Sequence, residues 1–260
     1  MSKEDQIIVN SLPRTDVIGV PITATNMGEC LSYIDSNLDA IRGSYVCVSN
    51  AHACVMAHDD PAYWEVQAGS VMSVPDGKPL SVIGRRKHPA MGRVTGPDLM
   101  REVFRMSPER GWRHFFYGST QGNLDALRVA LARDWPELEV ADMEPSVFRP
   151  LSNEEKAELA GRIDASGADF CWVALGAPRQ EVLCHDMEGM THSVMVGVGG
   201  AFNVLSGAVS DAPRWMKDHG LEWLYRLAQE PGRLWKRYLV TNTKFIAYQL
   251  TGAKRRRTRR

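Results

Sequence analysis

The sequence lacks an apolar run long enough to cross a membrane as a helix, which takes about 18 residues. Its first residues, MSKEDQIIVNSLPRTD, also lack the apolar core of a secretory signal peptide. We therefore expect a cytoplasmic chain without a membrane-spanning helix.

Cysteine is scarce, and its spacing suggests no pairing. The number of cysteines is odd and no two form a C-x-x-C motif, so neither a disulfide framework nor a zinc site is indicated. Most of them lie in apolar runs, which favours buried free thiols in a reducing compartment. They are Cys30, Cys47, Cys54, Cys171 and Cys184.

The chain has no net charge, because 31 Lys and Arg balance 31 Asp and Glu. The balance is uneven, since residues 213–260 hold 13 Lys or Arg against three Asp or Glu. This asymmetry indicates an anionic partner for the C-terminal segment, either a membrane or a nucleic acid. The hydrophobic share of 44% and the charged share of 24% exclude a chain that is disordered throughout.

Short apolar runs alternate with helical segments along most of the chain. This alternation predicts an α/β fold, with a mostly parallel sheet covered by helices on both faces. In such a sheet, ligands bind beyond the carboxyl ends of the strands. The runs are residues 44–48 (SYVCV), 70–74 (SVMSV), 114–117 (HFFY), 138–141 (LEVA), 169–175 (DFCWVAL) and 193–197 (SVMVG).

Weaker signals predict further elements. Residues 16–23 indicate one or two short strands, and Thr25 is a candidate N-cap for a helix that runs to about Leu38. Ser152 and Glu155 have the spacing of a capping box at the start of another helix.

The composition changes near residue 213, where the chain becomes rich in Trp, Tyr, Leu and Arg. This part predicts two or three amphipathic helices with a break near Pro231 and Gly232. We therefore divide the chain into a core at residues 1–212, a helical appendage at 213–250 and a basic tail at 251–260.

The loop GAPRQE at residues 176–181 follows a predicted strand. Gly176 permits a tight turn, and Pro178 suits the first turn of a helix. The N–H groups at that helix start suit a phosphate, and Gln180 offers a hydrogen bond to a phosphate or a sugar hydroxyl. An ordinary strand-to-helix turn explains the same residues.

A second glycine loop, GVGGAF, occupies residues 197–202. It lacks the G-x-G-x-x-G spacing of a dinucleotide site because residue 202 is Phe, and no strand precedes Glu222, the acidic residue further along. Gly199 nevertheless lets the backbone approach a nucleotide.

Asp76 follows a predicted strand in the sequence PDGKP. A carboxylate there faces the ligand edge of the sheet and suits a general base, although Asp-Gly is also a common turn pair.

Arg93 lies near a predicted helix start, where its forked donors suit a diphosphate. Asp98 in the same loop is a candidate helix cap.

Asn50 follows the strand that ends at Val48 and offers an amide to a substrate. The neighbouring His52 fits a structural role better.

These loops, in this order, resemble the WecG/TagA/CpsF group of glycosyltransferases. The resemblance covers roughly residues 18–248. It rests on VCVSNAH (46–52), PDGKPL (75–80), RVTGPDLM (93–100), FFYGST (115–120), GAPRQE (176–181), GVGGAFNVLSG (197–207), APRWMKDHGLEWLYRL (212–227) and PGRLWKRY (231–238).

The resemblance implies a Rossmann-like core that transfers N-acetylmannosamine, its uronic acid, glucose or a related sugar from UDP. The acceptor would be a sugar linked to polyprenyl diphosphate, and the product would feed bacterial cell-surface polysaccharides. It also implies that Asp76 is the base and that Asn50, Arg93 and Gln180 contact substrate. The appendage would meet the membrane and supply Arg214, Arg226 and Arg233 to the site.

No D-x-D motif is present; the nearest patterns are Asp59-Asp60 and Asp142-Met143-Glu144. We therefore expect no metal and no cofactor, with helix N-termini and arginines offsetting the charge on departing UDP. The family resemblance also implies that the transfer inverts the anomeric centre. We expect the enzyme at the inner face of the cell membrane, with the tail KRRRTRR drawn to anionic lipid and no nucleic-acid partner.

Two other functions compete with this hypothesis. One is a nicotinamide-dependent oxidoreductase, which the incomplete glycine fingerprint disfavours. The other is a non-enzymatic binding module whose basic tail holds a nucleic acid.

Overall fold

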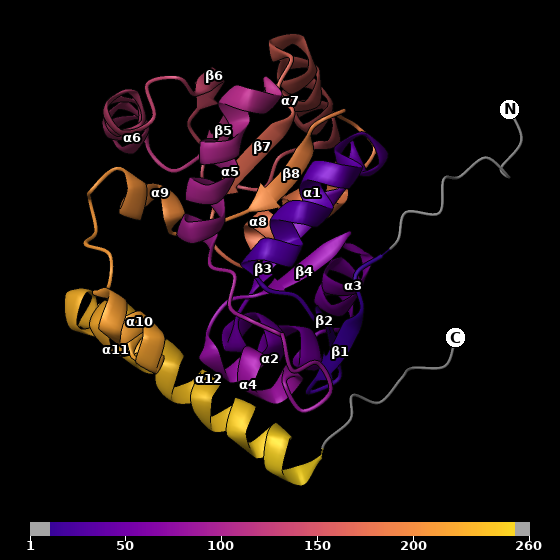
Figure 1. Cartoon of the computed structure of the whole chain (residues 1–260), viewed down its shortest axis with the longest axis vertical. Helices are drawn as coiled ribbons and strands as arrows, with labels where there is room; N and C mark the ends of the chain where they lie inside the picture. Colours follow the sequence, from indigo (N-terminus) through magenta and orange to yellow (C-terminus); the bar gives the residue numbers. More distant parts are fainter. Residues whose placement is uncertain (1–10, 253–260) are drawn as a thin grey trace, which may run out of the picture.

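The larger sheet in the described part of the chain has six strands, and all of them are parallel. The computed structural model describes residues 11–252, without the side chains of Arg214, Asp218 and Arg233. The strands pair in the order β4-β3-β8-β7-β5-β6, which confirms the predicted α/β class (Figure 1). Their bounds are β3 Tyr45–Ser49, β4 Met72–Pro75, β5 Arg113–Gly118, β6 Glu139–Glu144, β7 Phe170–Ala174 and β8 Val194–Gly197.

Helices cover both faces of the sheet, as predicted. Because side chains alternate along a strand, Phe170 and Trp172 of β7 enter one apolar core while Cys171 and Val173 enter the other. The first core is closed by α1 (Met27–Ile41), α5 (Gly96–Arg110), α6 (Gln121–Asp134) and α9 (Ala201–Leu205). The second is closed by α2 (Ala51–Asp59), α3 (Pro61–Gly69), α4 (Lys78–Gly84), α7 (Asn153–Ser166) and α8 (Arg179–Asp186).

The N-terminal elements differ slightly from the prediction. Residues 16–23 do form strands, in the antiparallel hairpin β1 (Arg14–Val17) and β2 (Val20–Thr23). The cap of α1 is Asn26 rather than Thr25, because the Asn26 side chain accepts from the Glu29 N–H at 3.0 Å. Thr25 is buried, and α1 ends at Ile41 rather than near Leu38.

Two further predictions are confirmed. Ser152 and Glu155 form the capping box of α7, with the Glu155 carboxylate accepting from the Ser152 N–H at 2.8 Å. All five cysteines are buried free thiols.

The predicted C-terminal helices are three: α10 (Arg214–His219), α11 (Glu222–Gln229) and α12 (Pro231–Thr251). Figure 1 shows α12 in yellow, running along the lower edge of the molecule beneath α2 and α4. No helix among residues 11–252 is long and apolar enough to cross a membrane. The division at residue 212 stays a prediction, and nearly all of the basic tail lies outside the described residues.

One side of α12 is docked onto the core. Thr241 and Phe245 are buried in this contact, and Asp59 at the end of α2 holds Lys244 at 2.7 Å and the Tyr248 hydroxyl at 2.6 Å. The appendage therefore has a fixed place against the core, and it brings the shorter helices α10 and α11 toward the ligand edge of the sheet.

Candidate active site

Four of the predicted residues lie at one edge of the sheet, beyond the carboxyl ends of neighbouring strands. Asp76 follows β4 and Asn50 follows β3; Gly199 follows β8 and Gly176 follows β7. Because neighbouring strands lie about 4.8 Å apart, this row is about 14 Å long. The parallel sheet thus brings together loops that are far apart in the sequence, along a line that suits an extended ligand.

Asp76 occupies a tight turn at the end of β4. Its N–H donates to the Ser49 carbonyl at 2.7 Å, which extends the pairing of β3 and β4 by one step. The next residue, Gly77, has a φ of 99°, a value that other residues rarely adopt. Burial, together with the nearby Glu222 carboxylate, raises the pKa of Asp76 to about 6. This carboxylate therefore holds a proton more readily than an exposed aspartate does.

Arg93 lies beside the Asp76 turn. The following residue, Val94, donates its N–H to the Pro75 carbonyl at 2.8 Å, so residues 93–94 run next to the end of β4. The Arg93 guanidinium extends toward the appendage, where Nη1 donates to Glu222 Oε2 at 3.0 Å. The predicted pair of carboxylate and arginine therefore shares one site.

Helix α11 contributes two charged groups to the same place. Glu222 binds Arg93 and also accepts from Arg226 Nη2 at 2.7 Å. Burial opposes the charge of Arg226, but Glu222 and Asp76 outweigh this effect and raise the pKa of the guanidinium. The side chains of Arg214 and Arg233, which we also expect at the site, lie outside the described residues.

Sequence reasoning missed Glu222 as a member of the site. The residue stands within the GLEWLYRL segment, but an acidic side chain on an amphipathic helix usually faces solvent. Only the folded contact between α11 and Arg93 reveals its position.

A second group of charges secures α10 and the start of α5. Lys217 Nζ lies 2.7 Å from Asp211 and 3.4 Å from Asp98, and Arg101 Nη1 lies 3.0 Å from Asp211 and 2.9 Å from Asp98. Asp98 is not the helix cap considered above. The cap of α5 is Thr95, whose hydroxyl accepts from the Asp98 N–H because residue 95 is the last extended position before the helix.

Gln180 is buried beneath the two glycine turns, with 3% of its surface exposed. Its Oε1 accepts from the Gly176 N–H at 2.9 Å, and its Nε2 donates to Glu181 at 2.8 Å. A Cβ on Gly197 would come within 3.2 Å of the Gln180 side chain. Gln180 therefore joins the turns after β7 and β8, with Pro178 at the start of α8 beside it.

Asn50 is exposed at the edge of the sheet and caps α2. Its Oδ1 accepts from the N–H groups of His52 and Ala53 at 3.0 and 3.2 Å. His52 packs toward α12, where Nδ1 lies 3.0 Å from the Thr241 hydroxyl. Burial and the charge of Arg237 lower the pKa of His52 to about 4, which keeps it neutral. These contacts fit the structural role expected for His52.

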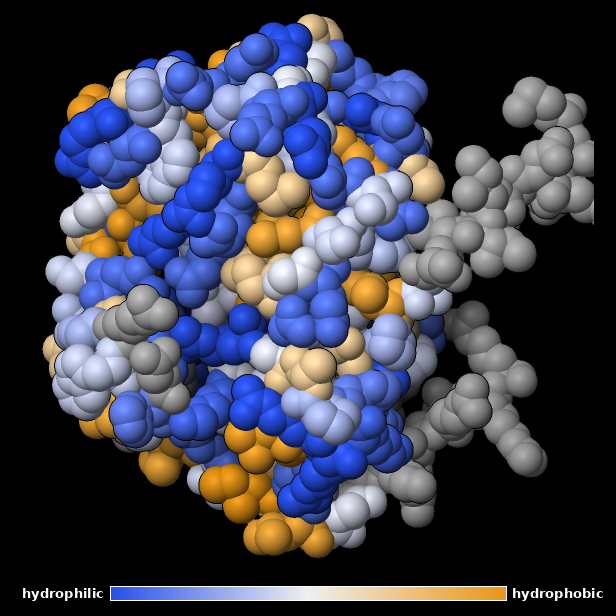
Figure 2. Space-filling model, viewed as in Figure 1, coloured by the Kyte–Doolittle hydropathy of each residue, from blue (hydrophilic) through white to orange (hydrophobic). Residues whose placement is uncertain are grey.

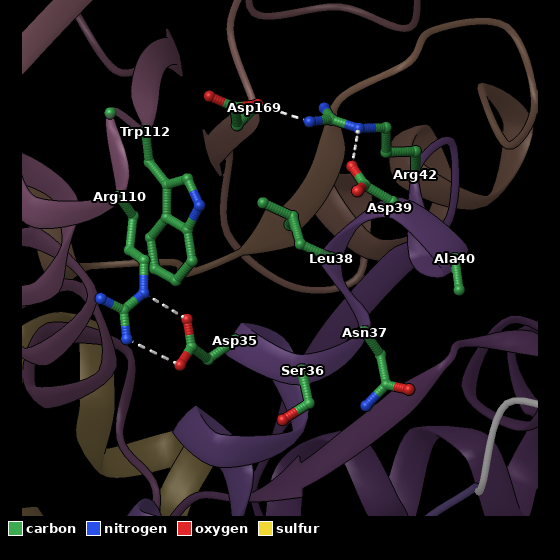
Figure 3. A pocket seen from close by; sticks show the side chains of 11 residues that line it. Asp35, Ser36, Asn37, Leu38, Asp39, Ala40, Arg42, Arg110, Trp112 and Asp169 are labelled. Carbon is green, nitrogen blue, oxygen red and sulfur yellow. Dashed lines mark hydrogen bonds and ion pairs between the residues drawn. The ribbon is translucent and has the colours of Figure 1, made fainter.

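A cavity of about 600 Å³ lies at the opposite end of the strands, next to the residues that precede β5 and β7. Figure 3 shows that its charged side chains pair with one another. Arg110 binds both oxygens of Asp35 at 2.7 and 3.0 Å, and Arg42 binds Asp39 at 3.0 Å and Asp169 at 2.8 Å. None of the predicted site residues lines this cavity, so it is a weaker candidate than the edge that carries Asp76.

Among residues 11–252, no three His, Cys, Asp or Glu side chains lie together in an arrangement that could hold a metal ion. That the reaction needs no metal stays a prediction, because a metal ion can also be held between the protein and a bound substrate. What the described site offers is a half-buried carboxylate flanked by two arginines, Arg93 and Arg226.

Comparison with known proteins gives two findings. The family model described as "Glycosyl transferase WecG/TagA/CpsF family" matches residues 15–260. A curated protein of Bacillus spizizenii, an N-acetylglucosaminyldiphosphoundecaprenol N-acetyl-beta-D-mannosaminyltransferase, is 30% identical over 210 residues. The aligned region covers 80% of this chain and 78% of that protein.

Proposed function

The chain belongs to the WecG/TagA/CpsF family of glycosyltransferases, and from this premise we propose that it transfers N-acetylmannosamine from UDP to an N-acetylglucosamine linked to polyprenyl diphosphate. The sugar and the acceptor are those in the name of the Bacillus spizizenii relative. UDP is the donor nucleotide that the sequence resemblance implies.

The reaction is a single displacement at the anomeric carbon. Asp76 accepts the proton of the acceptor hydroxyl as that oxygen attacks, and UDP departs from the opposite face, which inverts the anomeric configuration. A base whose pKa of about 6 lies near the working pH suits this proton transfer. No step requires a metal, because cationic side chains offset the charge on the leaving group.

The donor lies along the edge of the sheet from β7 to β4. Its diphosphate meets the N–H groups of the turns after Gly176 and Gly199, which Gln180 fixes from below. Arg93 and Arg226 stabilise the charge that develops on UDP, with help from Arg214 and Arg233. Asn50 binds the sugar beside Asp76.

The observation that carries this proposal is the convergence of Asp76, Arg93 and Arg226 at one point. These residues come from three separate segments of the chain, and the pKa of Asp76 responds to both arginines. A general base beside two cations is what an anionic leaving group and a hydroxyl nucleophile require.

The test is turnover of UDP-N-acetylmannosamine with a short-chain prenyl-diphosphate N-acetylglucosamine, measured as released UDP. We expect Asp76→Asn to bind UDP as the natural protein does while kcat falls roughly 10²–10⁴-fold, since the base is lost and the shape is kept. EDTA is expected to leave turnover of the natural protein unchanged.

Asp125→Asn is the matched control, because Asp125 is an exposed carboxylate on α6 that accepts a hydrogen bond from Gln121. It should retain full turnover. Unchanged kcat in Asp76→Asn would remove the base from the mechanism.

We also propose that the enzyme works at the inner face of the cell membrane, on the apolar side of α12. Trp235, Leu239, Ile246 and Leu250 are exposed large hydrophobic residues spaced four, seven and four apart, so they share one face of the helix. In Figure 2, orange residues gather at the lower edge of the molecule, where Figure 1 places α12. A lipid-linked acceptor would be reached from this surface.

A further inference from the structure

The Glu222 carboxylate holds two arginines that come from different parts of the chain. Its Oε2 accepts from Arg93, which precedes α5, at 3.0 Å, and its Oε1 accepts from Arg226, one helical turn later in α11, at 2.7 Å. Each oxygen therefore has its own guanidinium. The Glu222 side chain is 15% exposed, so this contact is largely shielded from water.

This arrangement resembles the way two arginines hold a phosphate. Carboxylate and phosphate oxygens both accept the planar donors of a guanidinium, and each arginine here binds one oxygen of Glu222. Arg93 Nη1 also lies 3.4 Å from the Lys217 carbonyl. A diphosphate has more acceptor oxygens and more negative charge than one carboxylate. It would therefore be the stronger ligand for the same pair of arginines.

Charge balance shows that Glu222 and a diphosphate cannot both stay in place at low cost. Asp76 and Glu222 already oppose the charges of Arg93 and Arg226, while the nearby Asp98 is paired with Lys217 and Arg101. A diphosphate placed beside Glu222 would crowd several anions around two cations in a partly dry site, where repulsion is strong.

We infer that Glu222 occupies the place of a substrate diphosphate in the unliganded protein, so that the ligand must displace it from Arg93 and Arg226 in order to bind. This inference rests on the proposed function. In it, Glu222 competes with substrate for the arginine pair, and closure of α11 over the edge of the sheet is reversible.

The packing of α11 permits this displacement. None of the described residues of α11 is buried, and its N-cap, Leu221, provides no side-chain hydrogen bond. A short helix with few buried groups belongs to the part of a fold that moves at low free-energy cost. The neighbouring α12 is different, since it is secured by Phe245 and the contacts of Asp59.

Two substrates carry a diphosphate in the proposed reaction, the nucleotide donor and the lipid-linked acceptor. The arginine pair recognises the chemistry that they share. Separate titrations with UDP and with geranyl diphosphate distinguish the two sources.

The experiment measures the dissociation constant of each ligand by calorimetry at fixed ionic strength, for the full-length natural protein and for Glu222→Gln. Glutamine keeps the size of the side chain but removes the competing charge. We expect at least about fivefold tighter binding in the variant for the ligand that uses the arginine pair. The reason is that Arg93 and Arg226 no longer have to be released from Glu222 before the ligand binds. Tightening for UDP alone assigns the pair to the donor, and tightening for geranyl diphosphate alone assigns it to the acceptor.

Asp211→Asn is the matched control. It removes a carboxylate from the neighbouring charge group, where its ion-pair partners are Lys217 and Arg101 rather than Arg93 or Arg226. Its affinities should stay within about twofold of the natural values, since the arginine pair is untouched. If Glu222→Gln does not fold, Glu222→Asp keeps the charge and shortens the reach, and it should show a smaller tightening.

The outcomes separate this inference from the proposed function. Affinities for both ligands that are equal or weaker in Glu222→Gln, with the natural protein binding UDP, would overturn the inference alone. Failure of both proteins to bind either diphosphate would overturn the inference and the proposed function together.

Discussion

Asp76 shows how neighbouring residues tune one carboxylate. Burial and the Glu222 charge raise its pKa, Arg226 and Arg93 lower it, and Asp98 raises it slightly, with a result of about 6. The base acts only when it is deprotonated. We therefore expect kcat/KM to fall about tenfold per pH unit below about pH 6 and to level off above it, because the fraction of ionised Asp76 follows that pKa.

The measurement is the pH profile of kcat/KM for the natural protein between pH 5 and 8, at constant ionic strength. Turnover that is flat down to pH 5 would contradict a base with this pKa. The unfolding midpoint at each pH serves as the control, since it separates titration of the base from loss of the fold.

The sequence predicts some of the residues at the site and misses others, for a physical reason. Asp76, Asn50, Gly176 and Gly199 each follow an apolar strand, so their shared edge can be read from the order of strands and turns. The contact partners of these residues depend on tertiary packing. Glu222 lies about 130 positions from Arg93, and nothing local in either segment indicates that they meet.

At the scale of elements, the strands are well predicted because buried parallel strands are continuous apolar runs. The run 193–197 differs from β8 by one residue at its start, and the run 44–48 is shifted from β3 by one residue at both ends. Boundaries set by side-chain hydrogen bonds are harder to predict. Thr25 and Asn26 are both good caps by type, and only the geometry selects Asn26.

The last helix shows the same limit. Its apolar periodicity is evident from the sequence, but the sequence does not tell which apolar positions are covered. Leu234 and Phe245 are buried, whereas Leu239 is 61% exposed although its side chain is equally apolar. The docking of α12 on α2 decides which face is left outward.

This outward face leads to a prediction about membrane binding. We expect Leu239→Glu to weaken binding to vesicles of phosphatidylcholine and phosphatidylglycerol about tenfold or more. The variant loses a leucine side chain that would be buried in the lipid and gains a negative charge, and both changes oppose insertion. Vesicle co-sedimentation of the full-length protein measures the effect.

Val129→Glu is the control for this change. Val129 is also an exposed apolar residue, on α6 and far from α12 in the chain, and its substitution adds the same charge. Equal vesicle binding by the natural protein and by Leu239→Glu would argue against α12 as the membrane surface.

At the scale of the whole molecule, the parallel sheet and the appendage divide the tasks of the enzyme. The sheet gathers the loops that carry Asp76, Asn50, Gly176 and Gly199 along one edge. The appendage docks beneath α2 and sets α11 beside that edge, so one segment both supplies an arginine and presents an apolar face outward (Figure 1). We propose that this arrangement joins a water-soluble donor to a lipid-linked acceptor.

The central claim is that this edge of the sheet binds the uridine diphosphate of the donor next to Asp76. The most direct test is a crystal structure of the full-length protein with UDP bound. We expect the diphosphate within hydrogen-bonding distance of Arg93 or Arg226 and of the turns after Gly176 and Gly199. Nucleotide bound instead in the cavity between Asp35 and Arg42, at the opposite end of the strands, would contradict the account.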